Sequence, residues 1–286
     1  MKRKRVDISK FITLFPLSFW MLAFVAIPLL YVIFISFMQR AGDGSILYSP
    51  SIESYTRMKN PLYLKVFLDS ISLAFVTTSI TLILGYPFAY CVAKISSRFR
   101  VFILILIIIP FWTNSLIRTY GWMILLQTDG LINHILLTLG VIKEPFKMLY
   151  TYGAVLIGMV YALFPFMVLP LYNSIEKLDK SYLEASKDLG ASKWTAFYTV
   201  TLPLTLPGVV AGCILVFIPS IGLFFIPDLM GGSKVMLIGN LIRNQFLQSR
   251  DWPFGGALSI VMISISLILI GVYIKIVGKK VDLEVF

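Results

Sequence analysis

Few side chains in this 286-residue sequence have the types and spacing that catalysis or metal binding requires. His134 is the only histidine, so a histidine metal site or a serine–histidine relay has no second member. Cys91 and Cys213 both lie in apolar runs, which argues against a disulfide framework or a cysteine zinc site. The glycine cluster at residues 231–234 lacks the spacing of a nucleotide-binding P-loop. The sequence therefore predicts a chain that is not an enzyme and that binds no ATP, metal or other cofactor itself.

One long polar stretch, residues 176–203, interrupts the apolar second half of the sequence. Its pattern predicts two short helices with a tight break between them. Ser181 and Glu184 have the spacing of a capping box at the start of the first helix, with Asp179 as a competing N-cap. Gly190 stands where that helix should stop, because glycine reaches the left-handed conformation at little cost.

The second short helix has its own boundary signals. Ser192 can cap it, since a serine side chain accepts a hydrogen bond from a backbone N–H of the first turn. Pro203, or the residues before it, must end or bend this helix, because proline lacks an N–H and clashes with the preceding turn. A compact helical segment of this kind between apolar runs is suited to being held by a partner protein.

The composition indicates an integral membrane protein. Hydrophobic residues make up 58% of the chain and the mean hydropathy is +0.87, too apolar for a soluble domain. The net charge of +11 does not indicate nucleic-acid binding, because the basic residues lie in short segments between apolar runs. A spanning helix needs about 20 mainly apolar residues. Such runs cover residues 11–38, 66–93, 101–126, 152–172, 204–229 and 257–277.

The fold class that follows is all-α, an integral membrane protein with six transmembrane helices. The first run follows the basic segment 2–5 and lacks a small-residue cleavage site, so we expect an uncleaved helix. The third run is broken by Pro110 and by polar residues from Thr113 onward. Apolar residues then recur at helical spacing over residues 131–139, which predicts a short helix lying in the membrane interface. Residues 39–65 are expected to form a loop.

The distribution of lysine and arginine predicts the orientation. If the N-terminus is cytoplasmic, fifteen basic residues lie in inner segments and nine in outer ones, with Arg118 inside a span. Positive side chains concentrate on the cytoplasmic side, so both termini and the polar stretch are predicted to be cytoplasmic. We expect three regions: an N-terminal part at 1–65, a five-helix core at 66–277 and a C-terminal tail at 278–286.

The polar stretch also carries a family motif. It resembles the EAA loop of ATP-binding cassette (ABC) importer permeases, whose pattern is Glu-Ala-Ala, three residues, Gly, nine residues, Ile, one residue and Leu-Pro. The matching residues are Glu184, Ala185, Ser186, Gly190, Val200, Leu202 and Pro203. Ser186 and Val200 depart from the pattern by small changes. Because the motif is long and its spacing is fixed, the chain is identified as a member of the type I ABC importer permeases.

This resemblance implies a cytoplasmic coupling helix that contacts an ATPase. The residues it assigns to that contact are Glu184, Ala185, Ser186, Asp188 and Gly190. Glu184 would either bond to the ATPase or hold the turn of its own loop. The small side chains of Ala185 and Ser186 would allow a partner surface to approach closely.

Other segments narrow the resemblance. Residues 110–118, 174–180, 228–232 and 250–255 are similar to the permeases of spermidine/putrescine (polyamine) importers, and the similarity extends from the second span onward. It implies a multi-pass protein of the bacterial inner membrane, embedded in the lipid bilayer and binding no nucleic acid. Its implied partners are a homologous second permease subunit, a homodimeric ABC ATPase that holds ATP and Mg²⁺, and an external polyamine-binding protein.

A polyamine importer also needs a path for a chain of ammonium charges. Asp228, expected at the outer end of the fifth span, and the aromatic Phe225 are the first candidates, because a carboxylate beside aromatic faces suits a cation. Trp112 and Asn114, at the break in the third span, are further candidates. Two other roles stay open for Asp228: it pairs with Arg118, or it lies in solvent at the helix end.

Two alternative functions also stay open at this stage. The chain could be the permease of a related ABC importer for another small solute. It could instead be a secondary transporter, although such proteins often carry acidic or histidine residues deep in their spans and this chain has almost none there. Copurification with an ATPase would distinguish an importer subunit from the secondary transporter.

Overall fold

A computed structural model describes residues 8–281 of the protein. The basic segment 2–5 and the last residues of the predicted tail lie outside the described residues. The chain divides into two compact units, the first made of Met1–Leu64 and Leu241–Ser264, the second of Lys65–Asn240 and Ile265–Phe286.

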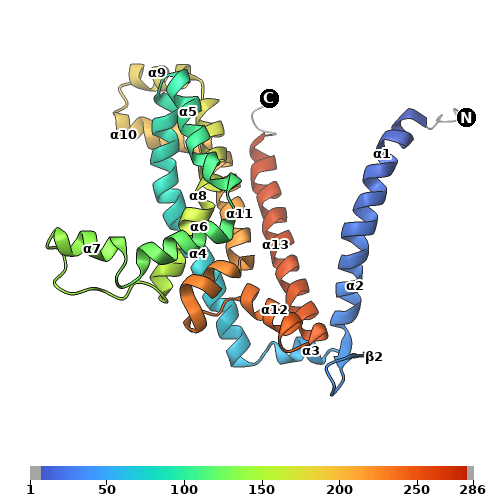
Figure 1. Ribbon diagram of the computed structural model, residues 1–286. Helices are drawn as coiled ribbons and strands as arrows, with labels where there is room; N and C mark the ends of the chain where they lie inside the picture. The colour runs from blue at the N-terminus through green and yellow to red at the C-terminus, as the bar shows by residue number, and fades with distance from the viewer. Residues whose placement is uncertain (1–7, 282–286) are drawn as a thin grey trace, which may run out of the picture. The chain divides into compact units, whose positions relative to one another are not determined.

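The first unit begins with α1 (Ile8–Met21), η1 (Leu22–Ala26), α2 (Ile27–Ser36), β1 (Met38–Arg40), β2 (Ile46–Pro50) and α3 (Glu53–Arg57). The next elements are α4 (Pro61–Lys94), α5 (Ser97–Ile108), η2 (Ile109–Trp112), α6 (Ser115–Leu126), α7 (Leu131–Thr138), α8 (Tyr152–Glu176), α9 (Lys180–Asp188), α10 (Lys193–Ala196), η3 (Phe197–Thr201), α11 (Leu202–Gly222), η4 (Pro227–Gly231) and η5 (Gly232–Lys234). Helices α12 (Ile238–Leu247) and α13 (Trp252–Val281) are each divided between the two units. Figure 1 labels most of these elements.

The predicted spanning helices are present. Within residues 8–281, five continuous helical segments are long and apolar enough to cross a membrane: Leu14–Ser36, Pro61–Lys94, Tyr152–Glu176, Lys193–Gly222 and Trp252–Val272. A sixth span is formed if the pair Ser97–Trp112 and Ser115–Thr138, bent by 97° at its break, counts as one. The predicted membrane-spanning, helical fold class is therefore confirmed.

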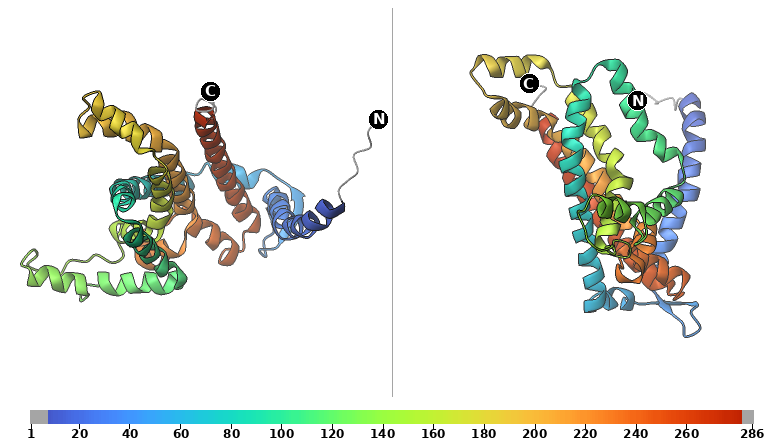
Figure 2. Two further views of the ribbon diagram at one scale, coloured as in Figure 1. Left: turned by 90° about the horizontal axis from the view of Figure 1, so that it is seen from above. Right: turned by 60° about the vertical axis from the view of Figure 1, so that its left-hand side comes forward.

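The break in the third span falls at the predicted polar residues. Asn114 caps α6, because its side-chain oxygen accepts a 2.8 Å hydrogen bond from the backbone N–H of Leu116. Beyond α6, the predicted interfacial helix is present as α7. Both Figure 1 and Figure 2 show α6 and α7 projecting sideways from the upright helices of the second unit.

The predicted extent of the fifth span is wrong at its C-terminal end. Helix α11 ends at Gly222, and the backbone leaves helical geometry at Leu223 instead of continuing to Leu229. The carbonyl of Gly222 lies so close to Gly239 that a Cβ there would approach it to 2.5 Å. The helix therefore ends at a close approach of two distant glycines, a contact for which hydropathy alone carries no signal.

Pro203 does not end the helix that precedes it. The segment from Lys193 to Gly222 is one apolar helix in which the wider π turn η3 precedes α11, and Pro203 lies in the first turn of α11. A π turn relieves the clash of the proline ring and the missing N–H locally, so the helix continues.

The segment expected to be a loop, residues 39–65, contains regular structure. Strands β1 and β2 pair antiparallel, with a turn at Asp43 and Gly44, and the short helix α3 follows. Gly44 has a φ of +84°. The hydroxyl and the N–H of Ser45 both donate to the Asp43 carboxylate and lower its pKa. An Asp-Gly pair is a hairpin signal, and it could have predicted this turn.

A buried carboxylate organises the first unit. Asp251 is 1% exposed and accepts a 2.8 Å hydrogen bond from the Arg57 guanidinium, with Arg40 at 4.0 Å. Its other oxygen accepts the N–H of Phe254 and so caps α13, while the Arg57 guanidinium lies 4.4 Å from the centre of the Phe254 ring. These bonds fasten the segment after α2 to the start of α13, which gives the sequence around residues 250–255 a structural role.

In the second unit, α8 and α11 pack side by side through small residues (Figure 1). A Cβ on Gly208 would lie 2.4 Å from the Ser174 Cβ and 2.8 Å from the Pro170 carbonyl. A Cβ on Gly212 would lie 2.7 Å from the Met167 sulfur. Close backbone approach at small residues is the usual basis of helix association in membranes. The two helices that flank the polar stretch are therefore held together as a pair.

Candidate functional site

The start of the polar stretch is capped by Asp179. Its carboxylate accepts a 2.9 Å hydrogen bond from the backbone N–H of Ser181, so Asp179 is the N-cap of α9 and Ser181 is not. This bond holds the pKa of the Asp179 carboxyl below its usual value. The carboxylate is therefore charged at neutral pH, which favours the positive end of the helix dipole.

The break between α9 and α10 has the predicted geometry. Gly190 has a φ of +81°. The N–H of Gly190 donates to Lys187 O at 2.8 Å, and the N–H of Ala191 donates to Ser186 O at 3.0 Å. These two bonds define a Schellman motif, in which the left-handed residue follows the helix. Ser192 then caps α10 by accepting the N–H of Thr195, as the sequence predicted.

The residues assigned to the ATPase contact differ in their exposure to solvent. Glu184, Ala185, Asp188 and Gly190 are exposed, so they are available to a partner. Ser186 is buried and its hydroxyl donates to Leu183 O of its own helix. The Ser186 hydroxyl is therefore engaged within its own helix, and a contact of Ser186 with a partner stays a prediction.

Exposed apolar side chains surround this segment, and sequence reasoning missed them. Leu189 is 89% exposed and Trp194 is 73% exposed. Beside them, a cavity of about 450 Å³ is lined by Tyr90, Lys94, Leu183, Lys187, Lys193, Trp194, Ala196, Phe197 and Thr201. Large exposed apolar side chains gathered on an otherwise polar segment are typical of a protein contact surface.

The base of this segment is fixed by one ion pair. Arg100 donates to the Glu176 carboxylate at 2.5 Å and to the carbonyls of Ala93 and Ile95 at 3.0 and 3.1 Å. Arg100 therefore ties the C-terminal ends of α4 and α8 to the start of α5. The α8 end of the α9–α10 segment is thus braced by α4 and α5.

Asp228, a predicted path residue, does not lie at the end of the fifth span. It lies in η4, partly buried, and its carboxylate accepts a hydrogen bond from the side-chain amide of Asn240. Asn240 is buried and also donates to Phe224 O at 2.8 Å. Asn240 therefore helps to hold Asp228 in position, and no local sequence pattern predicts this role.

Arg118 does not pair with Asp228. Its guanidinium lies over the Phe111 ring, 4.4 Å from the ring centre, and its Nε and Nη1 atoms have no hydrogen-bond partner among the described residues. A small cavity that it lines with Phe225 and Trp122 brings α6, α8 and η4 together. Among the described residues, the Arg118 guanidinium thus contacts an aromatic face and not a carboxylate.

The other two path candidates have different surroundings. Trp112 is 83% exposed, and the side chain of Asn114 is engaged in capping α6. Phe225 packs beside Arg118 in the small cavity, while Asp228 is bound to Asn240. The structure therefore gives Phe225 and Asp228 the more enclosed positions of the four.

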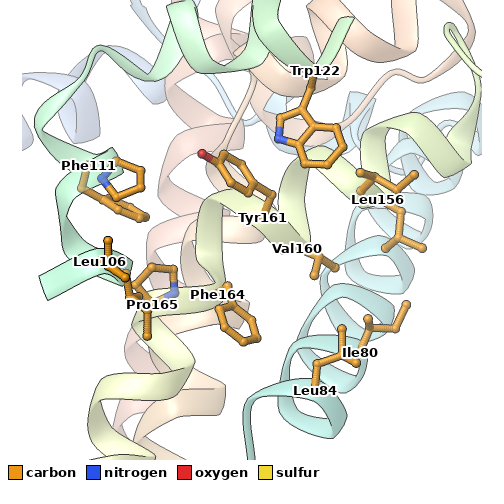
Figure 3. Close-up of a pocket in the computed structure, with 13 residues that line it drawn as sticks. Ile80, Leu84, Leu106, Phe111, Trp122, Leu156, Val160, Tyr161, Phe164 and Pro165 are labelled. Carbon is orange, nitrogen blue, oxygen red and sulfur yellow. The ribbon is translucent and has the colours of Figure 1, made fainter. Parts of the chain in front are cut away.

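A larger cavity of about 540 Å³ lies between α4, α5, η2, α6 and α8. Figure 3 shows its aromatic side chains, with Tyr161 between Phe111 and Trp122 in this view. Its lining has no acidic residue and almost no polar surface. An ammonium group that lost its water there would have no compensating charge, so this cavity is a poor waypoint for a polycation.

The chain matches a known transport family. The family described as "Binding-protein-dependent transport system inner membrane component" matches residues 81–282. The chain belongs to this family. The spermidine/putrescine transport system permease protein PotB of Escherichia coli (strain K12) is 49% identical over 268 residues, covering 93% of this chain and 98% of that protein. The PotB protein of Haemophilus influenzae is 47% identical, covering 93% and 94%.

The fold gives the same assignment. A crystal structure of a bacterial ABC transporter involved in the import of the acidic polysaccharide alginate contains a chain with a TM-score of 0.78, 14% identity and 96% coverage of both chains. At that identity the match shows the fold alone, which is that of an ABC importer permease. This permease is therefore a multi-pass inner-membrane transport component and not an enzyme, as predicted.

Proposed function

We propose that this permease is a membrane subunit of an ATP-driven polyamine importer, with spermidine and putrescine as its substrate class. The observation that carries the proposal is the near-complete match to a spermidine/putrescine permease, at 49% identity over almost the full length of both chains. The partners would be a homologous second permease, a homodimeric ATPase that holds ATP and Mg²⁺, and an external polyamine-binding protein.

The α9–α10 segment is the proposed coupling element. It would dock in a cleft of the ATPase with the exposed Glu184, Ala185 and Asp188 at the contact. The exposed Leu189 and Trp194 supply apolar area to the same surface. Because α8 and α11 are closely packed, closure of the ATPase would move the two helices together and change which side of the path is open.

The importer assignment can be tested by reconstitution. The chain, expressed with its partner subunits and placed in liposomes containing ATP, should copurify with an ATPase and import spermidine when the loaded binding protein is added. Uptake of a different solute alone would assign the chain to a related importer. Uptake driven by an ion gradient without an ATPase would identify a secondary transporter and refute the proposal.

The proposed topology places both termini and the α9–α10 segment in the cytoplasm. In a background with Cys91 and Cys213 replaced by serine, single cysteines at Ser49 or Lys147 should react with an impermeant thiol reagent added to intact cells. A cysteine at Leu189 should react only after the membrane is opened, because this exposed position would face the cytoplasm. Labelling of Leu189→Cys from outside would reverse the orientation.

We also propose that Asp228 and Phe225 line the substrate path, with Trp112 and Asn114 as secondary candidates. Asp228→Asn keeps the oxygen that accepts from Asn240 but removes the charge. A charge pair at ~4 Å and an effective dielectric of about 20 gives roughly 4 kcal/mol before desolvation, so uptake should fall at least about tenfold. Initial rates in proteoliposomes measure this.

Glu144→Gln is the matched control for the Asp228 variant, since it removes an exposed carboxylate from a loop outside the path. It should leave uptake unchanged. If Asp228→Asn assembles with the ATPase and imports at the normal rate, the carboxylate does not serve the path.

A further inference from the structure

A second carboxylate lines a cavity at the end of the second unit that lies away from the α9–α10 segment. The cavity, of about 380 Å³, lies where α4 and α8 begin their apolar spans and where η5 ends. Its side chains and backbone come from Asp69, Tyr150, Thr151, Tyr152, Lys234, Val235, Met236 and Leu237. Its lining includes an acidic, a basic and a hydroxyl side chain, in contrast to the large apolar cavity between α4 and α8.

Asp69 supplies the negative charge of this cavity. It is exposed on α4, and within the described part of the chain its carboxylate is in no ion pair. The wall beside it is fixed, because the neighbouring Ser70 hydroxyl accepts a 2.8 Å hydrogen bond from the N–H of Ile238. A carboxylate that is outside any ion pair and stands on a fixed wall is available to an external cation.

Two tyrosines stand beside the carboxylate. Tyr152, the first residue of α8, lines the same cavity as Asp69. Tyr150 has a φ of +62°, a left-handed conformation that is unfavourable for a bulky residue. Its N–H donates to Met230 O at 3.0 Å, and its ring packs against Gly232, which itself has a φ of +58°.

The unusual backbone at Tyr150 indicates that the ring position matters. A strained left-handed residue persists only when its surroundings hold it, and such residues cluster at ligand sites. Gly232 permits this arrangement, because a Cβ there would approach the Tyr150 ring to 3.1 Å. The surrounding structure therefore holds Tyr150 in a strained backbone conformation, which places its ring at the wall of this cavity.

The chemistry of the cavity selects organic cations. A carboxylate attracts any cation, whereas tyrosine faces add attraction for an alkylammonium group that carries little water. A metal ion would need several more oxygen ligands, and the described residues contain no cluster of three metal-ligating side chains. Lys234 lies at the same cavity and opposes any cation that enters.

We propose that this cavity is an entry site for a primary ammonium group of the polyamine, bound by Asp69 and by the rings of Tyr150 and Tyr152 before the substrate reaches Asp228. The identity of the cation rests on the proposed function. Lys234, which lines the same cavity, weakens binding so that the substrate can leave the site.

The test measures binding of radiolabelled spermidine to the assembled transporter in nanodiscs without binding protein, together with the KM for uptake. Asp69→Asn should weaken binding about three- to fivefold, the size of one exposed charge pair, and raise KM by the same factor with little change in kcat. Lys234→Gln should change both quantities in the opposite direction. Tyr152→Phe should keep most of the affinity, whereas Tyr152→Leu, which lacks the ring, should lose it.

Glu144→Gln serves again as the matched control, since it removes a loop carboxylate without touching the cavity. If the wild-type transporter imports spermidine while the Asp69 and Lys234 variants bind it like the control, the entry site is refuted and the proposed function stands. If the wild-type transporter neither binds nor imports any polyamine, the proposed function itself fails. Equal loss of affinity in Tyr152→Phe and Tyr152→Leu would show that the ring does not contact the cation.

Discussion

Replacing Gly190 with valine is expected to abolish ATP-driven uptake while the protein still inserts in the membrane. Gly190 has a φ of +81° at the turn between α9 and α10, and a β-branched residue is strongly disfavoured in that conformation. The cost is backbone strain of about 1–3 kcal/mol and not a clash, because a Cβ at this position would meet no atom within 4 Å. The turn should therefore open, and α10 should leave its position relative to α9.

Gly190→Asn distinguishes the effect of losing the turn from the effect of adding a side chain. Asparagine tolerates the left-handed conformation, so this variant adds a larger side chain than alanine and keeps the turn. It should retain most of the uptake, whereas Gly190→Ala should be intermediate. ATP-dependent spermidine uptake in proteoliposomes and copurification of the ATPase are the two measurements. Normal uptake by Gly190→Val would show that the turn does not transmit the ATPase movement.

The coupling segment could be predicted in detail because its signals are local. The left-handed Gly190 and the cap at Ser192 each depend on hydrogen bonds within three to five residues of sequence. Even here one local choice was ambiguous. Asp179 and Ser181 both offered a cap, and the carboxylate of Asp179 is the group that bonds. Propensity ranks the two residues almost equally at that position.

The ends of the spans could not be predicted from hydropathy. The apolar run from residue 204 to residue 229 is continuous in sequence, yet α11 stops at Gly222. The turn depends on the close approach of Gly239, which lies 17 residues later. Hydropathy measures the free energy of transferring side chains to lipid. A turn that is buried in protein forms its backbone hydrogen bonds there, so an apolar run can contain a turn that hydropathy does not reveal.

The partners of the charged residues could not be predicted from the sequence either. The sequence suggests Asp228 and Arg118 as partners, because they are charges of opposite sign in apolar surroundings. The structure gives Asp228 the amide of Asn240 and gives Arg118 the face of Phe111. In the same way, nothing local connects Asp69 with Tyr150. Contacts between residues so distant in sequence depend on helix packing, and the pattern of a single sequence does not specify that packing.

Replacing Gly208 with valine is expected to disrupt both the stability and the transport activity of the permease. A Cβ at this position would lie 2.4 Å from the Ser174 Cβ and 2.8 Å from the Pro170 carbonyl, so α8 and α11 must separate. Overpacking of this kind costs about 1–3 kcal/mol, and the larger side chain should reach the upper part of that range. Thermal unfolding in detergent and uptake in proteoliposomes measure the two effects.

A compensating pair of variants identifies the cause. Gly208→Ala alone should lower the melting temperature, and adding Ser174→Gly should recover part of the loss, because it removes the atom nearest to the new methyl group. Gly271→Ala, in α13 with no neighbour within 4 Å, should have little effect. If the stability of the double variant recovers and uptake recovers with it, close packing of α8 and α11 is what transmits the movement of the α9–α10 segment. If stability recovers and uptake does not, the two helices need a specific contact at Ser174, and the rigid-pair mechanism is wrong.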